Sequence, residues 1–146
     1  MTSQQVVKRA SKLSLVCDTL LQDGLQQAPV QLRQLARLKL RTHQWKLDAE
    51  TMVEGVQARL AGVLYEELTV NNKPPAGERV KQAVLCHDQY ITAAKKYNRL
   101  RAVDAFVADC IDAVNQKLSA MKAQTEIVRV EAAAYIDPQP ITKGRK

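Results

Sequence analysis

The strongest constraint on the fold is an apolar repeat in the last third of the chain. From Val107 to Val128, seam positions recur at alternating steps of four and three, and only Thr125 among them is polar. Side chains at this spacing share one face of an α-helix, and about three heptads of it are typical of a coiled-coil seam. Apolar residues extend the face upstream to Tyr97, which predicts a long helix over about 88–135. The seam positions are Val107, Ile111, Val114, Leu118, Met121, Thr125 and Val128.

A second long helix is predicted before the only strong break in the chain. We expect it to begin near Pro29, because proline is favoured in a first turn, and to end near Leu68. About forty helical residues span roughly 60 Å. Two Asn, two Pro and a Gly within residues 70–77 then predict a turn. The two long helices should therefore form an antiparallel hairpin. The apolar seam of the earlier helix consists of Trp45, Ala49, Met52, Val56, Leu60, Val63 and Leu64.

Two shorter helices complete the predicted set. The first runs from Ser3, a plausible N-cap, to about Leu21, and Asp23-Gly24 supplies its stop. The other covers about 78–86, and Asp88 is expected to cap the long helix that follows it. The residues expected on the buried side of this short helix are Val80, Val84 and Leu85.

Composition agrees with an all-α fold in a single domain. Hydrophobic residues make up 46% of the 146 residues but aromatic residues only 4%, which favours long helices with aliphatic seams over a compact sheet. A long helix pair encloses little interior, so much of its apolar surface should close against other subunits. We predict a long antiparallel helical hairpin with a short N-terminal helix, assembling through coiled-coil-like seams. Residues 1–135 would form one helical oligomerising domain, and 136–146 a disordered basic tail.

The sequence favours a cytoplasmic location, in the host cell if the chain is phage-encoded. Its three cysteines have no paired spacing, which is typical of a reducing compartment. No apolar run resembles a signal peptide or a membrane span, so no membrane association is expected.

Motifs for catalysis and cofactor binding are absent from the sequence. Neither phosphate-binding glycine loop occurs, and the two histidines form no metalloprotease pattern. A zinc site from Cys17, Cys86 and His87 would need an unusual fold, because closed zinc sites use short paired spacings. Neighbouring side chains on a helix do not face each other, which disfavours a Cys86–His87 nucleophile. We expect no enzymatic activity and no cofactor.

The net charge of +7 is concentrated in particular segments. Arg33, Arg37 and Arg41 recur at every fourth position and sweep roughly 80° around one helix face. Lys39 and Lys46 lie in the same segment, which contains no acidic residue between Gly24 and Leu47. Such a row suits a phosphate backbone, with an affinity that falls as salt rises. The alternatives are a solvated face, or a row paired with acidic residues of another subunit.

A second basic cluster opens the last long helix. Basic residues there oppose the helix dipole, and this mild cost favours binding over simple solvation, although both interpretations stay open. Trp45 lies beside Arg41 and Lys46, where a base could stack on the indole. Because Trp45 also belongs to the apolar seam, core packing is the favoured interpretation. The second cluster consists of Lys95, Lys96, Arg99 and Arg101.

Three segments together resemble the phage UvsY-type recombination mediators. They are V-Q-A-R-L-A-G-V-L-Y at 56–65, K-P-P-A-G-E-R-V-K-Q-A-V-L-C-H-D-Q-Y at 73–90, and the seam from Tyr97 to Val128 with E-A at 131–132. The resemblance covers roughly residues 30–132. Of the family's basic K-x-R, Arg59 is present while Gln57 replaces the lysine. The upstream arginine row is therefore expected to take more of the binding.

The resemblance implies a ring-like homo-oligomer, typically hexameric or heptameric, that binds single-stranded DNA. Such mediators help a RecA-like recombinase displace single-stranded-DNA-binding protein during recombination and repair, and they need no nucleotide or metal of their own. The expected DNA-binding residues are Arg33, Arg37, Lys39, Arg41, Lys46, Arg59, Lys95, Lys96 and Arg99.

Two other hypotheses fit the same pattern. A helical protein–protein adaptor or inhibitor would use the seams and the charge to dock onto an acidic partner, without binding DNA. A structural helical component would assemble without any affinity for nucleic acid. No base-reading element distinguishes DNA from RNA.

Overall fold

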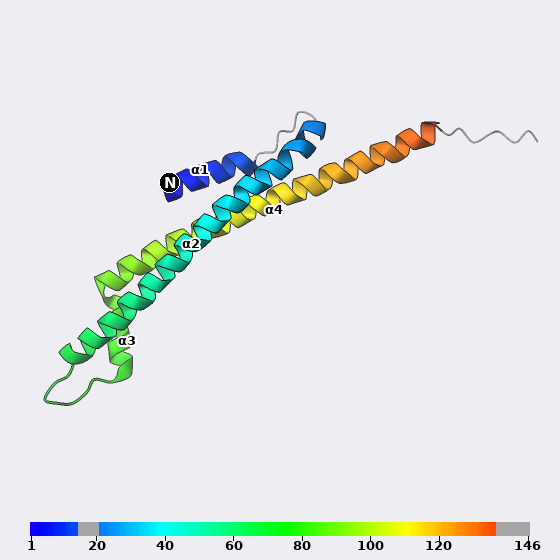
Figure 1. The fold of residues 1–146 in the computed structure, drawn as a ribbon. Coiled ribbons are helices and arrows are strands. Elements are labelled where there is room, and N and C mark those ends of the chain that lie inside the picture. Colours follow the sequence, from blue (N-terminus) through cyan, green and yellow to red (C-terminus); the bar gives the residue numbers. More distant parts are fainter. Residues whose placement is uncertain (15–20, 137–146) are drawn as a thin grey trace, which may run out of the picture.

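Two long helices packed against each other dominate the architecture (Figure 1). The computed structural model describes residues 1–14 and 21–136, which contain α1 (Ser3–Ser14), α2 (Leu21–Glu67), α3 (Gly77–Cys86) and α4 (Asp88–Ile136). The 47 residues of α2 run antiparallel to the first part of the 49-residue α4. The predicted all-α fold and long antiparallel hairpin are confirmed.

The main core lies where α1 packs across the α2–α4 pair, more extensively against α4. A helix of 12 residues is marginal alone, so α1 depends on the two apolar side chains that it buries, Val6 and Ala10. From the long helices, Leu35, Val107 and Val114 are fully buried. The buried residues of this core are Val6, Ala10, Ala28, Leu35, Leu38, Val103, Val107, Cys110 and Val114.

The opposite end of the hairpin contains the predicted turn and α3. Asn71 and Asn72 both adopt positive φ, 51° and 60°, within a tight turn closed by backbone hydrogen bonds between Val70 and Lys73. Asparagine tolerates this left-handed conformation better than most residues. Helix α3 buries Val80 and Val84 as predicted.

Leu85, by contrast, is 53% exposed, so its predicted burial is wrong. The ten-residue α3 buries one narrow stripe, and Leu85 lies about 100° around the helix from Val84, outside that stripe.

The predicted start of the second helix is also wrong. Helix α2 begins at Leu21, passes through Asp23 and Gly24, and includes Pro29 in its interior. Proline removes one backbone hydrogen bond there, but the preceding Ala28 is fully buried in the core. Packing of this turn therefore outweighs the local signals that predicted a boundary. The part of the predicted first helix beyond Ser14 falls on residues 15–20, which include Cys17 and lie outside the described residues.

Both predicted helix caps are displaced by one residue. Thr2 rather than Ser3 caps α1: the Thr2 hydroxyl accepts a hydrogen bond from the Gln5 backbone N–H (3.3 Å), and the Gln5 side chain accepts one from the Thr2 N–H (2.8 Å). This reciprocal pair is a capping box. At α4, the His87 Nδ1 accepts from the Gln89 N–H (3.2 Å), and Asp88 is the first helical residue.

The last part of α4 continues beyond the end of α2, and we call this part the C-terminal arm (residues 122–136; Figure 1). Every side chain from 122 to 133 is exposed, including Ile127, Val128 and Val130 at about 60%. The predicted α4 seam is therefore covered only as far as Met121. In the α2 seam, Met52 and Val63 are likewise exposed, at 52% and 47%. The predicted tail lies outside the described residues from residue 137 onward.

Candidate nucleic-acid interface

A buried carboxylate joins the two long helices in the middle of the hairpin. Asp104 of α4 is 6% exposed, and its Oδ1 accepts hydrogen bonds from the Thr42 hydroxyl (2.8 Å) and from the Lys39 Nζ (2.9 Å). The Lys39 Nζ also donates to the Asp104 backbone carbonyl (2.9 Å). Burial raises the pKa of Asp104, but hydrogen bonds from Lys39 and Thr42 and the charges of Lys39 and Lys46 outweigh it, so the pKa lies below its usual value. Lys39, predicted to contact DNA, is thus engaged within the protein.

The arginine row occupies an open surface of α2. Arg33, Arg37 and Arg41 are all exposed, and within the described part of the chain none lies within ion-pair distance of a carboxylate. Helical spacing of four residues places successive guanidinium groups about 6 Å apart along the axis. The Arg41 Nη1 approaches the Met1 Sδ at 4.0 Å. The row therefore ends beside the N-terminal residues that precede α1.

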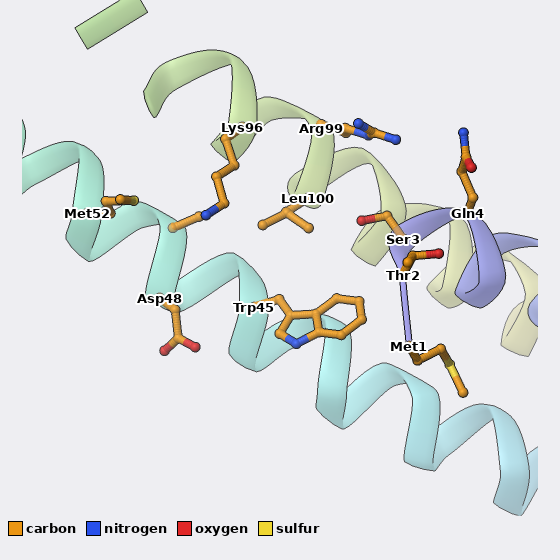
Figure 2. Close-up of a pocket in the computed structure, with 11 residues that line it drawn as sticks. Met1, Thr2, Ser3, Gln4, Trp45, Asp48, Met52, Lys96, Arg99 and Leu100 are labelled. Atoms are coloured by element: carbon orange, nitrogen blue, oxygen red, sulfur yellow. The ribbon is translucent and has the colours of Figure 1, made fainter. Parts of the chain in front are cut away.

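The basic cluster of α4 meets the same N-terminal residues from the other side. Lys96 and Arg99 are exposed and line a cleft of about 660 Å³ between α2, α4 and the start of α1 (Figure 2). Arg99 also lines a smaller adjoining hollow together with Lys8. Of the two basic segments, the one on α4 therefore lines the cleft, while the arginine row on α2 ends at its edge. The arginine row reaches the cleft through Met1, which lines the cleft and is approached by Arg41.

The cleft has an apolar interior and one acidic residue. Trp45 and Ala49 of α2 and Leu100 of α4 line it, and Figure 2 shows the Trp45 indole projecting from α2 into the space between the elements. The half-buried Trp45 also packs against the main core, so the predicted packing role holds for part of the ring. Asp48 lies at the cleft, and its carboxylate accepts a hydrogen bond from the Gln44 Nε2 (2.8 Å).

The remaining predicted site residues lie apart from this cleft. Arg59 is fourteen residues along α2 from Trp45, about 21 Å, and its Nη2 donates to the Gln89 Oε1 (2.7 Å). Lys46 is half-buried on α2, and its charge acts on Asp104. Lys95 is exposed on α4 but does not line the cleft.

Sequence reasoning missed the contribution of the N-terminus to this site. Met1, Thr2 and Gln4 line the cleft because the capping box starts α1 at this point, against α2 and α4. The T-x-x-Q pattern of a capping box was the available signal for the start of α1. Nothing local in the sequence indicated where α1 would dock.

Comparison with protein families, with characterised proteins and with solved structures finds no match for this chain. No helix in the described part is both long and apolar enough to cross a membrane. The described residues also contain no group of three or more His, Cys, Asp or Glu side chains that could hold a metal ion.

Proposed function

We propose that the protein is a recombination mediator of the UvsY type, which binds single-stranded DNA as a homo-oligomer. In this role it promotes the loading of a RecA-like recombinase onto strands coated with single-stranded-DNA-binding protein. It acts by binding and presenting the strand and catalyses no reaction. Its sequence resemblance to that family and the arrangement of its basic residues support the proposal.

The observation that carries the proposal is a basic row on α2 that ends at the edge of a cleft lined by Lys96 and Arg99 of α4. The row on α2 consists of Arg33, Arg37 and Arg41. Its last member, Arg41, contacts Met1 at the edge of the cleft that Lys96 and Arg99 line from α4. Along the helix axis, the row from Arg33 to Trp45 covers about 18 Å. A surface of this kind neutralises several successive phosphates and releases their counterions.

Weak contacts of one subunit become tight binding when several subunits share one strand. Linking sites in an oligomer turns each further contact into an intramolecular event. The C-terminal arm is our candidate for this assembly, because its apolar residues Ile127, Val128 and Val130 are exposed along a single unpartnered helix. Exposed apolar side chains on such a helix can be buried by packing against another copy of the chain. The family resemblance implies a hexamer or heptamer.

The test removes the arginine row and measures binding. The variant Arg33→Ala/Arg37→Ala/Arg41→Ala should lose most of its affinity for labelled single-stranded DNA in fluorescence anisotropy, because three phosphate contacts per subunit are lost. Circular dichroism and sedimentation should show unchanged folding and assembly, since all three side chains are exposed.

A charge-matched control separates a local site from general basicity. The variant Lys73→Ala/Arg79→Ala/Lys81→Ala removes three exposed cations at the opposite end of the hairpin and should bind as the wild type does. Equal losses in both variants would mean that only net charge matters. Normal binding by the arginine variant would refute the assignment, and a helical adaptor that docks on a protein partner would then be the better hypothesis. Loading of a recombinase onto coated strands is the functional readout that follows.

A further inference from the structure

The cleft around Trp45 combines three features that a simple basic surface does not need. It is hollow, it contains the indole of the chain's one tryptophan, and it has cations on its edge. The indole packs on the core yet stays half-exposed to the cleft (Figure 2). A phosphate backbone could bind the arginine row without any of these features. The cleft therefore suits a ligand that has an aromatic or apolar part.

Charge identifies the other part of that ligand as anionic. Lys96 and Arg99 line the cleft, and Arg41 lies next to Met1 at its edge. Asp48 is the one acidic residue of the described chain that lines the cleft, and its carboxylate already accepts a hydrogen bond from Gln44. The charge around the cleft is therefore net positive. Neither Lys96 nor Arg99 lies within ion-pair distance of a carboxylate in the described residues.

The position of Trp45 on α2 links the cleft to the arginine row. Arg33, Arg37, Arg41 and Trp45 follow one another at every fourth residue, so they form one ridge of the helix. A strand whose phosphates follow the three arginines therefore arrives at the indole within about one further helical turn. The volume of about 660 Å³ lies in the range of sites for molecules of nucleotide size.

We propose that the cleft binds an unpaired nucleobase of single-stranded DNA, stacked on the indole of Trp45, with the flanking phosphates held by Lys96 and Arg99. This inference rests on the proposed function and adds to it a preference for strands with accessible bases. Paired bases in a duplex are stacked on their neighbours and cannot enter the cleft. Stacking of this kind is tolerant of base identity, because every base presents a π-face.

The test compares two single strands that carry the same phosphates but differ in their bases. Oligo(dT) should quench the fluorescence of Trp45, which is the only tryptophan and reports on the cleft directly. An abasic strand of equal length should bind roughly tenfold more weakly and leave the fluorescence unquenched, because it can contact the arginines but cannot stack. Affinity for both strands is measured by anisotropy under the same salt.

Variants assign this difference to the indole. Trp45→Leu should lower the affinity for oligo(dT) to that for the abasic strand, while Trp45→Phe keeps part of the preference. Tyr65→Leu removes an exposed aromatic far along α2 and should change nothing. Because Trp45 also packs on the core, thermal melting confirms that each variant is folded, and the affinity for the abasic strand serves as an internal control.

Each other outcome overturns the inference in a distinguishable way. Equal affinity for the two strands would mean that phosphates alone are bound, so the proposed function would stand without the base site. Absence of binding to both strands would overturn the proposed function and this inference together. Quenching by an acidic peptide such as oligo-glutamate with phenylalanine, but not by oligo(dT), would assign the cleft to a protein ligand.

Discussion

The middle of the hairpin and the C-terminal arm show one apolar pattern in two different environments. In the middle, Val107 and Val114 are fully buried beneath α1 and α2. In the arm, Val128 continues the same repeat on the same helix, yet it is 61% exposed, and the neighbouring Ile127 is 58% exposed. The difference lies in the presence of neighbouring helices, because neither α1 nor α2 reaches the arm (Figure 1).

Periodicity therefore predicts a helix and its apolar face but not what covers that face. Burying one aliphatic side chain is worth about 1.5–3 kcal/mol, so several exposed ones amount to a substantial unused driving force. In the middle this driving force stabilises the hairpin and positions the cleft. In the arm it is unused within the described chain, and the proposed assembly would use it.

The largest expected effect comes from truncating a core side chain, compared with truncating an exposed side chain in the arm. Leu35→Ala should lower the free energy of unfolding by about 3 kcal/mol, because the side chain is fully buried and its removal leaves a cavity. Ile127→Ala should change it by less than about 0.5 kcal/mol, since the side chain is largely exposed. Urea unfolding is followed by circular dichroism at concentrations where the chain is monomeric.

The arm variant then separates folding from assembly. Sedimentation at higher concentration should show that Ile127→Ala weakens self-association. A loss of stability similar to that of Leu35→Ala in the monomer would show that the arm packs within one chain, and the contrast between the two regions would fail.

The next effect concerns the buried carboxylate in the middle of the hairpin. Asp104→Asn should lower the free energy of unfolding by about 2 kcal/mol at pH 7, because the ion pair with Lys39 is lost. Since the pKa of Asp104 is depressed in the folded state, its contribution is complete above the unfolded pKa of about 3.9 and disappears as the pH falls through the folded value. The gap between wild type and variant should therefore narrow below about pH 4.

Asp48→Asn is the matched control for this pH dependence. Its carboxylate is exposed, and among the described residues it accepts a side-chain hydrogen bond from Gln44 alone, so the change should stay within about 0.5 kcal/mol. A gap for Asp104→Asn that stays constant from pH 7 to pH 3 would mean that the carboxylate stabilises the hairpin by packing and not by charge.

The smallest of these effects tests the capping box that begins α1. Thr2→Ala should cost about 1 kcal/mol, because the Gln5 N–H loses its acceptor. Hydrogen exchange should report the loss in α1 and leave the arm unchanged, since α1 packs on the main core and does not reach the arm (Figure 1). Ser3→Ala, at the residue that the sequence alone favoured as the cap, should have little effect. A larger loss for Ser3→Ala than for Thr2→Ala would contradict the capping geometry.

The sequence was sufficient to predict the elements but not how they close on each other. The hairpin, its turn and α3 follow from periodicity and from the break at 70–77, which are local signals. The helix boundary predicted at Pro29 was wrong, because the burial of Ala28 outweighs the preference of proline for a first turn. The site was half predictable: Arg33, Arg37 and Arg41 share a face by helical arithmetic alone. The register of the two long helices decides that Lys39 pairs with Asp104 and that Arg99 lines the cleft. No local sequence signal contains this register.

The most direct test of the central claim is the salt dependence of single-stranded DNA binding. The logarithm of the binding constant should fall linearly with the logarithm of the salt concentration, with a slope of about −0.7 for each phosphate contacted. Replacing Arg33, Arg37 and Arg41 by alanine should make this slope shallower by about 2 for each subunit bound. We expect tight single-strand binding together with this change in slope. The absence of binding at low salt, or a slope that the triple replacement leaves unchanged, would contradict it.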